Sequence, residues 1–195
     1  MRETFEGAGG ISELLTALEA AAPSPAGGTA AAVVAAMAAS LVVMVGRTSP
    51  EWPDGTEIAI EAATLRDRLV ALGAEDVRAF AAVLSAVRNP AESAAGALVE
   101  ALVRASEVPL EIAQSAADVA QLAARAADEG KSQLRPDANA AAILAEAATR
   151  AAASLVRVNV AALPCDTDTV TTAELLAAAR AAQDRAAGQI RAARC

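Results

Sequence analysis

Hydrophobic residues recur along most of the chain at the three- and four-residue spacings of an α-helix, and alternating strand-like patterns are nearly absent. The pattern is interrupted where proline, glycine and other loop-forming residues gather. Between these breaks the sequence predicts helices over residues 11–22, 29–47, 56–88, 91–129, 137–163 and 171–193. Because the connections are short, we expect an all-α fold, an antiparallel bundle of five to six long helices that forms a single domain over residues 1–195.

Individual residues indicate where these helices begin, bend and end. Thr29, Thr56 and Asp137 each stand at the start of a predicted helix, where a short polar side chain can cap the free amide groups. Gly130 is suited to closing the helix that begins near residue 91. Pro109 falls inside that helix, so we expect a kink or a short break there.

Alanine dominates the hydrophobic content, which reaches 55% of the residues while aromatic residues make up only 2%. Small side chains bury little area each, so the helices have to pack closely. The uncharged run 29–46 is of marginal length for a membrane span, but it is rich in alanine, and no basic cluster or aromatic belt flanks it. We therefore expect a buried bundle helix and no membrane partner.

The charge balance and the absence of histidine exclude several classes of function. The net charge is −8 with no basic face, so a nucleic-acid partner is not expected. Two cysteines make no disulfide framework, and Cys165 with Asp166 and Asp168 would be a poor metal site, so we expect no bound metal. Residues 1–10 lack the basic and apolar pattern of a signal peptide, which favours a cytoplasmic location.

Asp76 is the polar residue most out of place in the pattern. It occupies a heptad-like seam whose other members are hydrophobic: Leu65, Leu69, Leu72, Phe80, Val83 and Val87. A carboxyl group in a buried seam has a raised pKa, which suits a general acid or base. The alternative is that Glu75 and Asp76 restart a helix after Gly73, with Asp76 in its first turn.

Three further features are candidates for a polar pocket. Asn159 points to the apolar side of its helix, where an amide either binds a ligand or fixes helix register. Gly27 and Gly28 precede a helix whose first amides can hold an anion, although such glycines also simply form turns. Asp137 follows Arg135-Pro136 at the start of a predicted helix, where its position alone indicates a helix cap.

These features occur in the order of a known family. Its first motif, a proline, three glycines and a serine before a helix of small residues, is matched by Pro25 to Thr29. Later motifs are matched by Asp76-Val77-Arg78-Ala79-Phe80 leading to Arg88-Asn89-Pro90, by Val108-Pro109-Leu110, by Gly130-Lys131 with Pro136-Asp137, and by Val156 to Asn159. Over residues 10 to 165 the chain resembles the cyclodeaminase domain of formiminotransferase-cyclodeaminase and the related methenyltetrahydrofolate cyclohydrolases.

The resemblance implies a helical homodimer that binds a folate. The activity it implies first is hydrolysis of 5,10-methenyltetrahydrofolate to 10-formyltetrahydrofolate, since no formiminotransferase domain is part of this sequence. The alternative activity is cyclisation of 5-formiminotetrahydrofolate with loss of ammonia. Neither reaction needs a cofactor beyond the tetrahydrofolate substrate.

The resemblance also implies the residues of the site. Asp76 and Asp137 would be catalytic, and the folate would be bound by Gly27, Gly28, Thr29, Arg88, Lys131 and Asn159. We expect the inward polar groups to converge on one cavity. The chain departs from the family pattern at Ala26, Ala91, Lys131 and Leu155, so the alternative is a binding or scaffold subunit that keeps the fold without catalysis.

Overall fold

The computed structural model describes residues 8–20, 26–88, 96–164 and 169–192, and within these ranges it contains helices and no strand. The helices are α1 (Ala8–Leu18), α2 (Gly27–Thr48), α3 (Gly55–Arg88), α4 (Ala97–Glu129), α5 (Arg135–Ala161) and α6 (Thr169–Ala192), with a short 3-10 turn, η1, at Ser132–Leu134. The predicted all-α bundle of long helices is confirmed.

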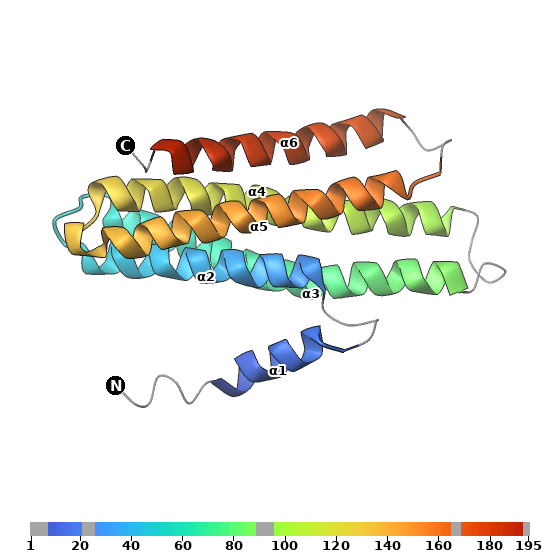
Figure 1. Cartoon of the computed structure of the whole chain (residues 1–195), viewed down its shortest axis with the longest axis horizontal. Helices are drawn as coiled ribbons and strands as arrows, with labels where there is room; N and C mark the ends of the chain where they lie inside the picture. The colour runs from blue at the N-terminus through green and yellow to red at the C-terminus, as the bar shows by residue number, and fades with distance from the viewer. Residues whose placement is uncertain (1–7, 21–25, 89–95, 165–168, 193–195) are drawn as a thin grey trace.

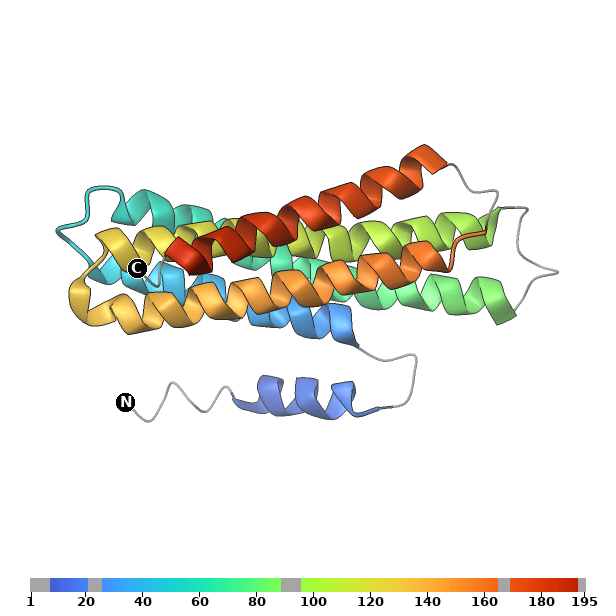
Figure 2. The ribbon, with the colours of Figure 1, turned by 45° about the horizontal axis from the view of Figure 1, so that its top comes forward.

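Helices α2 to α5 form an elongated four-helix bundle, and α6 lies along one side of it against α4 and α5 (Figures 1 and 2). Consecutive helices of the bundle are joined at its ends and run antiparallel. Helix α1 stands apart from the bundle in both views. Its Ile11 and Leu15 are more than half exposed, so its apolar side is not covered by the described part of the chain.

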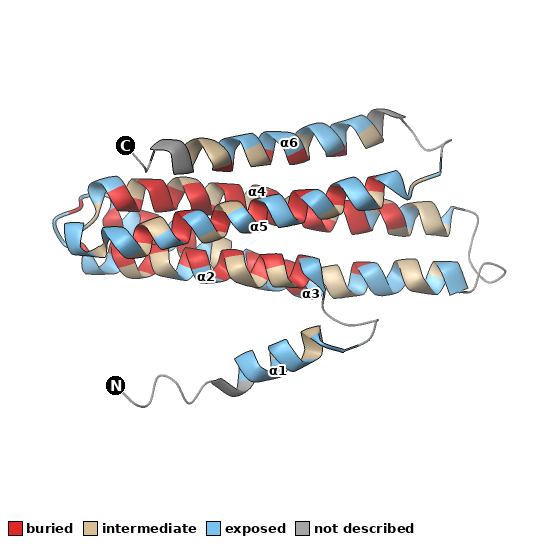
Figure 3. Cartoon of the chain, in the orientation of Figure 1, coloured by how far each residue is buried: buried red, intermediate tan, exposed pale blue. Residues whose placement is uncertain are grey.

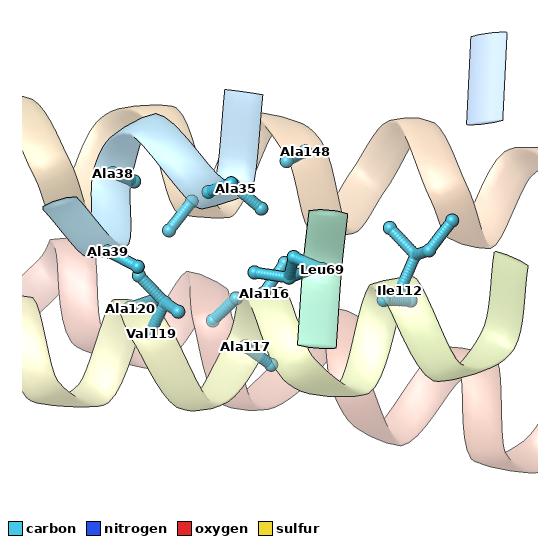
Figure 4. Close-up of a cluster of buried hydrophobic side chains, with 14 of the residues drawn as sticks. Ala35, Ala38, Ala39, Leu69, Ile112, Ala116, Ala117, Val119, Ala120 and Ala148 are labelled. Carbon is cyan, nitrogen blue, oxygen red and sulfur yellow. The ribbon is translucent and has the colours of Figure 1, made fainter. Parts of the chain in front are cut away.

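The core of the bundle is built mainly from alanine, with a few larger side chains between. Figure 3 shows the buried positions facing inward along α2, α4 and α5. In Figure 4, Leu69 and Ile112 fill the space between helices whose facing residues are alanines such as Ala35 and Ala116. These side chains are fully buried. Because an alanine core leaves the backbones close together, dispersion contacts between helices replace the bulk of large side chains.

Two helix starts differ from the sequence prediction because the chain turns earlier than the capping residues suggest. Helix α2 begins at Gly27, so Thr29 lies in its first turn and is not its cap. Helix α5 begins at Arg135, which places Asp137 in the first turn as well. In both helices the residue before the first turn makes no side-chain capping bond. The side chain of Thr29 is used instead to contact another helix.

Helix α4 also departs from the prediction. Its described part begins at Ala97, after Gly96 with a φ of 93°, a left-handed conformation that glycine adopts without strain. The predicted start at Ala91 lies outside the described residues. The helix is uninterrupted at Pro109, so of the expected kink or short break the short break is wrong. Gly130 ends the helix with a φ of −74°, and it is glycine because a Cβ would lie 2.5 Å from the Ala126 carbonyl oxygen.

The unequal lengths of α2 and α3 create the feature that matters most for the site. Helix α2 has 22 residues and α3 has 34, and they pack from Gly46 against Gly55 at one end to Gly28 against Asp76 at the other. Beyond Asp76, α3 runs on without α2 beside it (Figure 1). The predicted apolar seam is therefore buried at Leu69 and Leu72 but exposed at Phe80 and Val87.

Helix α2 is the one described helix that is long and apolar enough to cross a membrane, with a mean hydropathy of 2.2 over its most apolar stretch. It runs inside the bundle, where Ala32, Ala35 and Val42 have no exposed surface. In this structure 61% of that apolar stretch is buried, against α3, α4 and α5, and Met37 is among its exposed residues.

Candidate active site

A cavity of about 240 Å³ lies where α2 begins. It occupies the space between α3, α4 and α5 that α2 would fill if it extended further toward its N-terminus. Its lining comes from four helices and the residue before α2: Ala26, Gly27, Gly28, Asp76, Val77, Ala79, Phe80, Ala105, Leu155, Val158 and Asn159. The cavity therefore brings together Gly27, Gly28, Asp76 and Asn159, as the sequence predicted, although they are up to 132 positions apart.

Asp76 is held against the start of α2 by Thr29. The Thr29 backbone N–H donates a hydrogen bond of 3.0 Å to Oδ2 of Asp76, and the Thr29 hydroxyl lies 3.3 Å from the same oxygen. Burial raises the pKa of Asp76 above its ordinary value, and the two Thr29 contacts offset part of that rise. The carboxyl group is thus fixed in orientation while its proton affinity is increased.

Gly28 leaves just enough room for this carboxyl group. A Cβ atom at position 28 would lie 2.1 Å from Oδ1 and 2.6 Å from Oδ2 of Asp76, which no side chain could tolerate without displacing the carboxylate. The carboxyl group consequently rests directly on the backbone of the first turn of α2, where the free amides carry partial positive charge.

Asn159 lies across the cavity on α5, and its amide is also held in place. Its Nδ2 donates a short hydrogen bond to the backbone carbonyl of Ala105 on α4. Ala105 itself lines the cavity, so this bond both joins α4 to α5 and fixes the plane of the amide at the cavity wall. The two readings of Asn159 from the sequence, ligand binding and helix register, are therefore compatible in this position.

The remaining wall is apolar. Phe80 from α3 and Val158 from α5 are 41% and 64% exposed, and Leu155 lies beside Gly27, 3.7 Å from where a Cβ would stand. Among the described lining residues Asp76 is the only ionisable one. The cavity thus presents one carboxyl group and one amide opposite an apolar surface, which suits a flat ring that carries a polar edge.

Three predicted site residues lie elsewhere in the chain. Lys131 and Asp137 are at the opposite end of the bundle. Asp137 is 22 residues before Asn159 on the same helix, or about 33 Å at the helical rise. Arg88 is exposed at the end of α3, 12 residues beyond Asp76 and so about 18 Å away. The expectation that Asp137 joins Asp76 in one cavity within a single chain is wrong, because α5 is straight and spans the bundle.

Lys131 belongs instead to a second cavity of about 520 Å³ at that far end. Its backbone N–H donates to the buried hydroxyl of Ser49, and the indole N–H of Trp52 donates to Glu129. Gly130 packs so closely that a Cβ would lie 2.9 Å from Val45. These contacts join the α2–α3 connection and the end of α2 to the end of α4 and the loop after it, which gives them a structural role.

Sequence reasoning missed several residues of the cavity. Ala105, Ala79 and Val158 carry no chemical signal, and only the packing of α3, α4 and α5 brings them to the wall. The link between Thr29 and Asp76 was hidden because Thr29 reads as a helix cap. Among the described residues no group of three histidine, cysteine, aspartate or glutamate side chains is placed to hold a metal. The motif at 165–168 lies outside the described residues.

Comparison with known proteins finds relatives of this chain in both sequence and fold. A family model described as formiminotransferase-cyclodeaminase matches residues 10–180. A methenyltetrahydrofolate cyclohydrolase from Methylorubrum extorquens is 36% identical over 162 residues, which cover 76% of this chain and 78% of the relative. A formiminotetrahydrofolate cyclodeaminase from Thermotoga maritima has the same fold, with a TM-score of 0.83 and 24% identity over 94% of this chain and 93% of that one. The extent of the family match and the identity to the cyclohydrolase show that this chain belongs to the formiminotransferase-cyclodeaminase family.

Proposed function

We propose that this protein is a folate one-carbon enzyme that hydrolyses 5,10-methenyltetrahydrofolate to 10-formyltetrahydrofolate. The observation that carries the proposal is the carboxyl group of Asp76, half-buried at the wall of an otherwise uncharged cavity and oriented by Thr29. A relative that is 36% identical is a methenyltetrahydrofolate cyclohydrolase, which supports the same reaction here.

The shape of the cavity suits the reacting end of a folate. Its volume of about 240 Å³ is below the ~300 Å³ at which pockets hold a whole drug-sized ligand. It would therefore take the fused ring system, with the remainder of the molecule outside. The ring faces would lie against Phe80, Leu155 and Val158, and the polar ring edge would face Asp76 and Asn159.

Asp76 would move the protons of the reaction. The bridging carbon of the methenyl group shares a positive charge with its two nitrogens, so an adjacent carboxylate is attractive to it. Asp76 accepts a proton from water as the water oxygen bonds to that carbon, which gives a neutral carbinol. The bond from the carbon to N5 then breaks, N5 takes the proton back from Asp76, and the carbinol hydroxyl loses its proton to solvent as the formyl C=O forms.

The orientation of Asp76 assigns different roles to its two oxygens. Oδ2 is already engaged by the Thr29 amide, whereas Oδ1 lies over Gly28 beside the cavity. In our proposal Oδ1 carries the transferable proton. A raised pKa suits both steps, because a carboxylate that takes up a proton more readily is the better base and its acid form remains available to N5.

Spectroscopy of the substrate tests the proposal. Purified protein should accelerate the loss of methenyl-folate absorbance beyond the rate of spontaneous hydrolysis. Asp76→Asn should fold and lower that rate by about 100-fold or more, since general acid–base catalysis contributes about that much. Asp67→Asn is the matched control, because Asp67 lies on the same helix but is exposed and paired only with Arg66. A wild-type rate in Asp76→Asn would refute the role of Asp76.

Two other outcomes would point to different functions. Release of ammonia from 5-formiminotetrahydrofolate, without acceleration of methenyl hydrolysis, would identify a cyclodeaminase, the activity named for the Thermotoga maritima protein that shares the fold. Binding of a folate without turnover of either compound would indicate a scaffold subunit. Each outcome replaces the cyclohydrolase proposal.

We further propose that the reaction needs no cofactor beyond the tetrahydrofolate substrate. Proton transfer by one carboxyl group is sufficient for the steps above, and the 195 residues of the sequence include no histidine. The rate of methenyl hydrolysis should therefore be unchanged after exhaustive treatment with a chelator. A loss of activity that added metal restores would contradict this.

We also propose that two copies associate through the face formed by α2 and α5. Helix α2 carries no charged residue from Gly27 to Gly46, and its Met37 is 57% exposed. The adjoining side of α5 exposes Ala140, Ile143, Ala147, Ala151, Ser154 and Val158. A chain with a net charge of −8 would repel its own copy on most faces, so an uncharged face about 30 Å long favours self-association.

An antiparallel arrangement of the two copies would also give Lys131 and Asp137 a role. Those residues lie at the end of the bundle opposite the Asp76 cavity. A partner related by a twofold axis that lies in the plane of this face, perpendicular to the helices, would bring its far end beside the cavity. We propose a cytoplasmic location with no membrane or nucleic-acid partner, since the apolar α2 is an interior helix and the chain is acidic.

A further inference from the structure

The hydroxyl group of Thr29 has two acceptors within reach but only one proton. It lies 3.0 Å from the backbone carbonyl oxygen of Gly73, in a fully buried contact, and 3.3 Å from Oδ2 of Asp76. A hydroxyl donates one hydrogen bond at a time. Both acceptors are on α3, one turn apart, so rotation about the Cα–Cβ bond of Thr29 is not needed for the proton to turn from one to the other.

The protonation state of Asp76 decides which acceptor is preferred. When Asp76 is ionised, a hydrogen bond to the charged Oδ2 is the stronger of the two. When Asp76 is protonated that advantage is lost, and the shorter contact to the Gly73 carbonyl is favoured. Gly73 is inside α3, so its carbonyl already accepts the helical bond and does not depend on Thr29.

The other ionisable groups near Asp76 are either paired elsewhere or too far from its carboxyl group to compensate its charge in place of Thr29. Helix α2 offers none between Gly27 and Gly46. On α3, the neighbouring Glu75 is engaged by Arg68 and by Arg104 of α4. On α5, Arg157 is exposed and donates to Gln183 of α6. The cavity lining contains no ionisable side chain besides Asp76 among the described residues.

We infer that Thr29 is a positioning residue whose hydroxyl proton follows the charge on Asp76, turning to Oδ2 when the carboxylate forms and to the Gly73 carbonyl when it is neutralised. The Thr29 proton stays on its own oxygen throughout, so the hydroxyl group stabilises the carboxylate without entering the reaction. This inference rests on the proposed function of Asp76 only for its use in catalysis. The response of the Thr29 hydroxyl to the charge on Asp76 takes place in the protein without bound folate.

The test measures Asp76 directly, without any folate. In protein labelled with ¹³C at the aspartate side-chain carboxyl, the Asp76 signal is identified as the one that Asp76→Asn removes, and its pH titration is recorded. Thr29→Val keeps the shape and the backbone N–H but lacks the hydroxyl, so the titration midpoint should shift upward. Thr29→Ser keeps the hydroxyl and should titrate close to the wild type.

Two results would overturn the inference. The first is a Thr29→Val midpoint equal to that of the wild type. The second is failure of both Thr29→Val and Thr29→Ala to fold while Thr29→Ser folds, since the hydroxyl would then serve only to hold α2 to α3. If the protein lacks cyclohydrolase activity but the midpoint shifts as expected, the proposed function fails and the positioning role stands.

Discussion

At the scale of single residues, the site depends on a carboxyl group placed where the helix pattern requires a leucine. Asp76 is accommodated there because the first turn of α2 supplies a donor, the Thr29 amide, and because Gly28 leaves space for the carboxylate. A buried polar group without such partners would cost about 1–3 kcal/mol. The neighbouring backbone therefore both permits and orients the functional side chain.

The raised pKa of Asp76 predicts a pH dependence of stability. A group whose pKa is higher in the folded than in the unfolded state contributes most below the unfolded value, and the contribution is lost as the pH rises through the folded value. The free energy of unfolding of the wild type, relative to Asp76→Asn, should thus fall as the pH rises above the ordinary aspartate range and then level off. Denaturant unfolding at several pH values measures this, and a constant difference would contradict it.

Gly28→Ala should disable the site while leaving the fold intact. The added Cβ would overlap the Asp76 carboxylate, which must move because the backbone of α2 cannot. We expect a loss of methenyl hydrolysis of about tenfold or more, since small misplacements of a catalytic group are costly. Gly188→Ala is the control, because a Cβ there meets nothing within 4 Å. Equal activity in the two variants would show that the carboxylate position is unimportant.

At the scale of the elements, the important fact is that α2 is shorter than the helices around it. Its far end is locked at Gly46, where a Cβ would lie 2.4 Å from the carbonyl oxygen of Gly55. Its N-terminal end lies beside Asp76. Because α2 does not extend further along α3, the cavity remains there. The close contact at Gly46 thus fixes the register of α2 against α3, and this register places Gly28 beside Asp76 at the other end.

Gly46→Ala should therefore destabilise the protein, because the new methyl group would force α2 away from the start of α3. Overpacking of this kind costs about 1–3 kcal/mol. Gly188→Ala should instead stabilise it by about 0.5–1 kcal/mol, since alanine is the better helix former and the position is open. Thermal unfolding of the two variants distinguishes them, and a shift of both in the same direction would be inconsistent with close α2–α3 packing.

At the scale of the whole molecule, the bundle leaves one uncharged face uncovered, along α2 and α5. Ion pairs among the described residues lie mostly on other faces of the bundle. An example is the network between α3 and α4 that is formed by Arg68, Glu75, Arg104 and Glu111. Such exposed pairs contribute little to stability but keep those faces hydrated. The distribution of charge thus distinguishes the faces that remain in water from the face we assign to a second copy.

A charge placed on that face should separate the two copies. In the proposed dimer, Met37→Glu would bury a carboxylate in the uncharged interface with the second copy. The measured mass at micromolar concentration should therefore fall from dimer to monomer. Val70→Glu is the matched control, because Val70 is 59% exposed on α3, compared with 57% for Met37. Analytical ultracentrifugation of the three proteins tests this. A monomeric wild type, or a dimeric Met37→Glu variant, would contradict the proposed interface.

The helical content, the approximate helix boundaries and the inward position of Asp76 follow from the sequence alone. These are local properties, since the spacing of hydrophobic residues and the position of prolines and glycines act over a few turns. The sequence also indicated that Gly27, Gly28 and Asn159 belong with Asp76, and all four line one cavity. Their convergence was predicted from inward-facing polar residues on neighbouring helices.

Only the tertiary structure decided which ends of the helices meet. Asp137 and Asn159 share α5, yet the length of that helix carries them to opposite ends of the bundle. Thr29 reads as a cap but acts across the interface to Asp76 and Gly73, because α2 begins two residues earlier. The cavity itself exists because α2 stops beside Asp76 while α3 continues. Relative helix length and register depend on contacts between distant segments, and no local pattern encodes them.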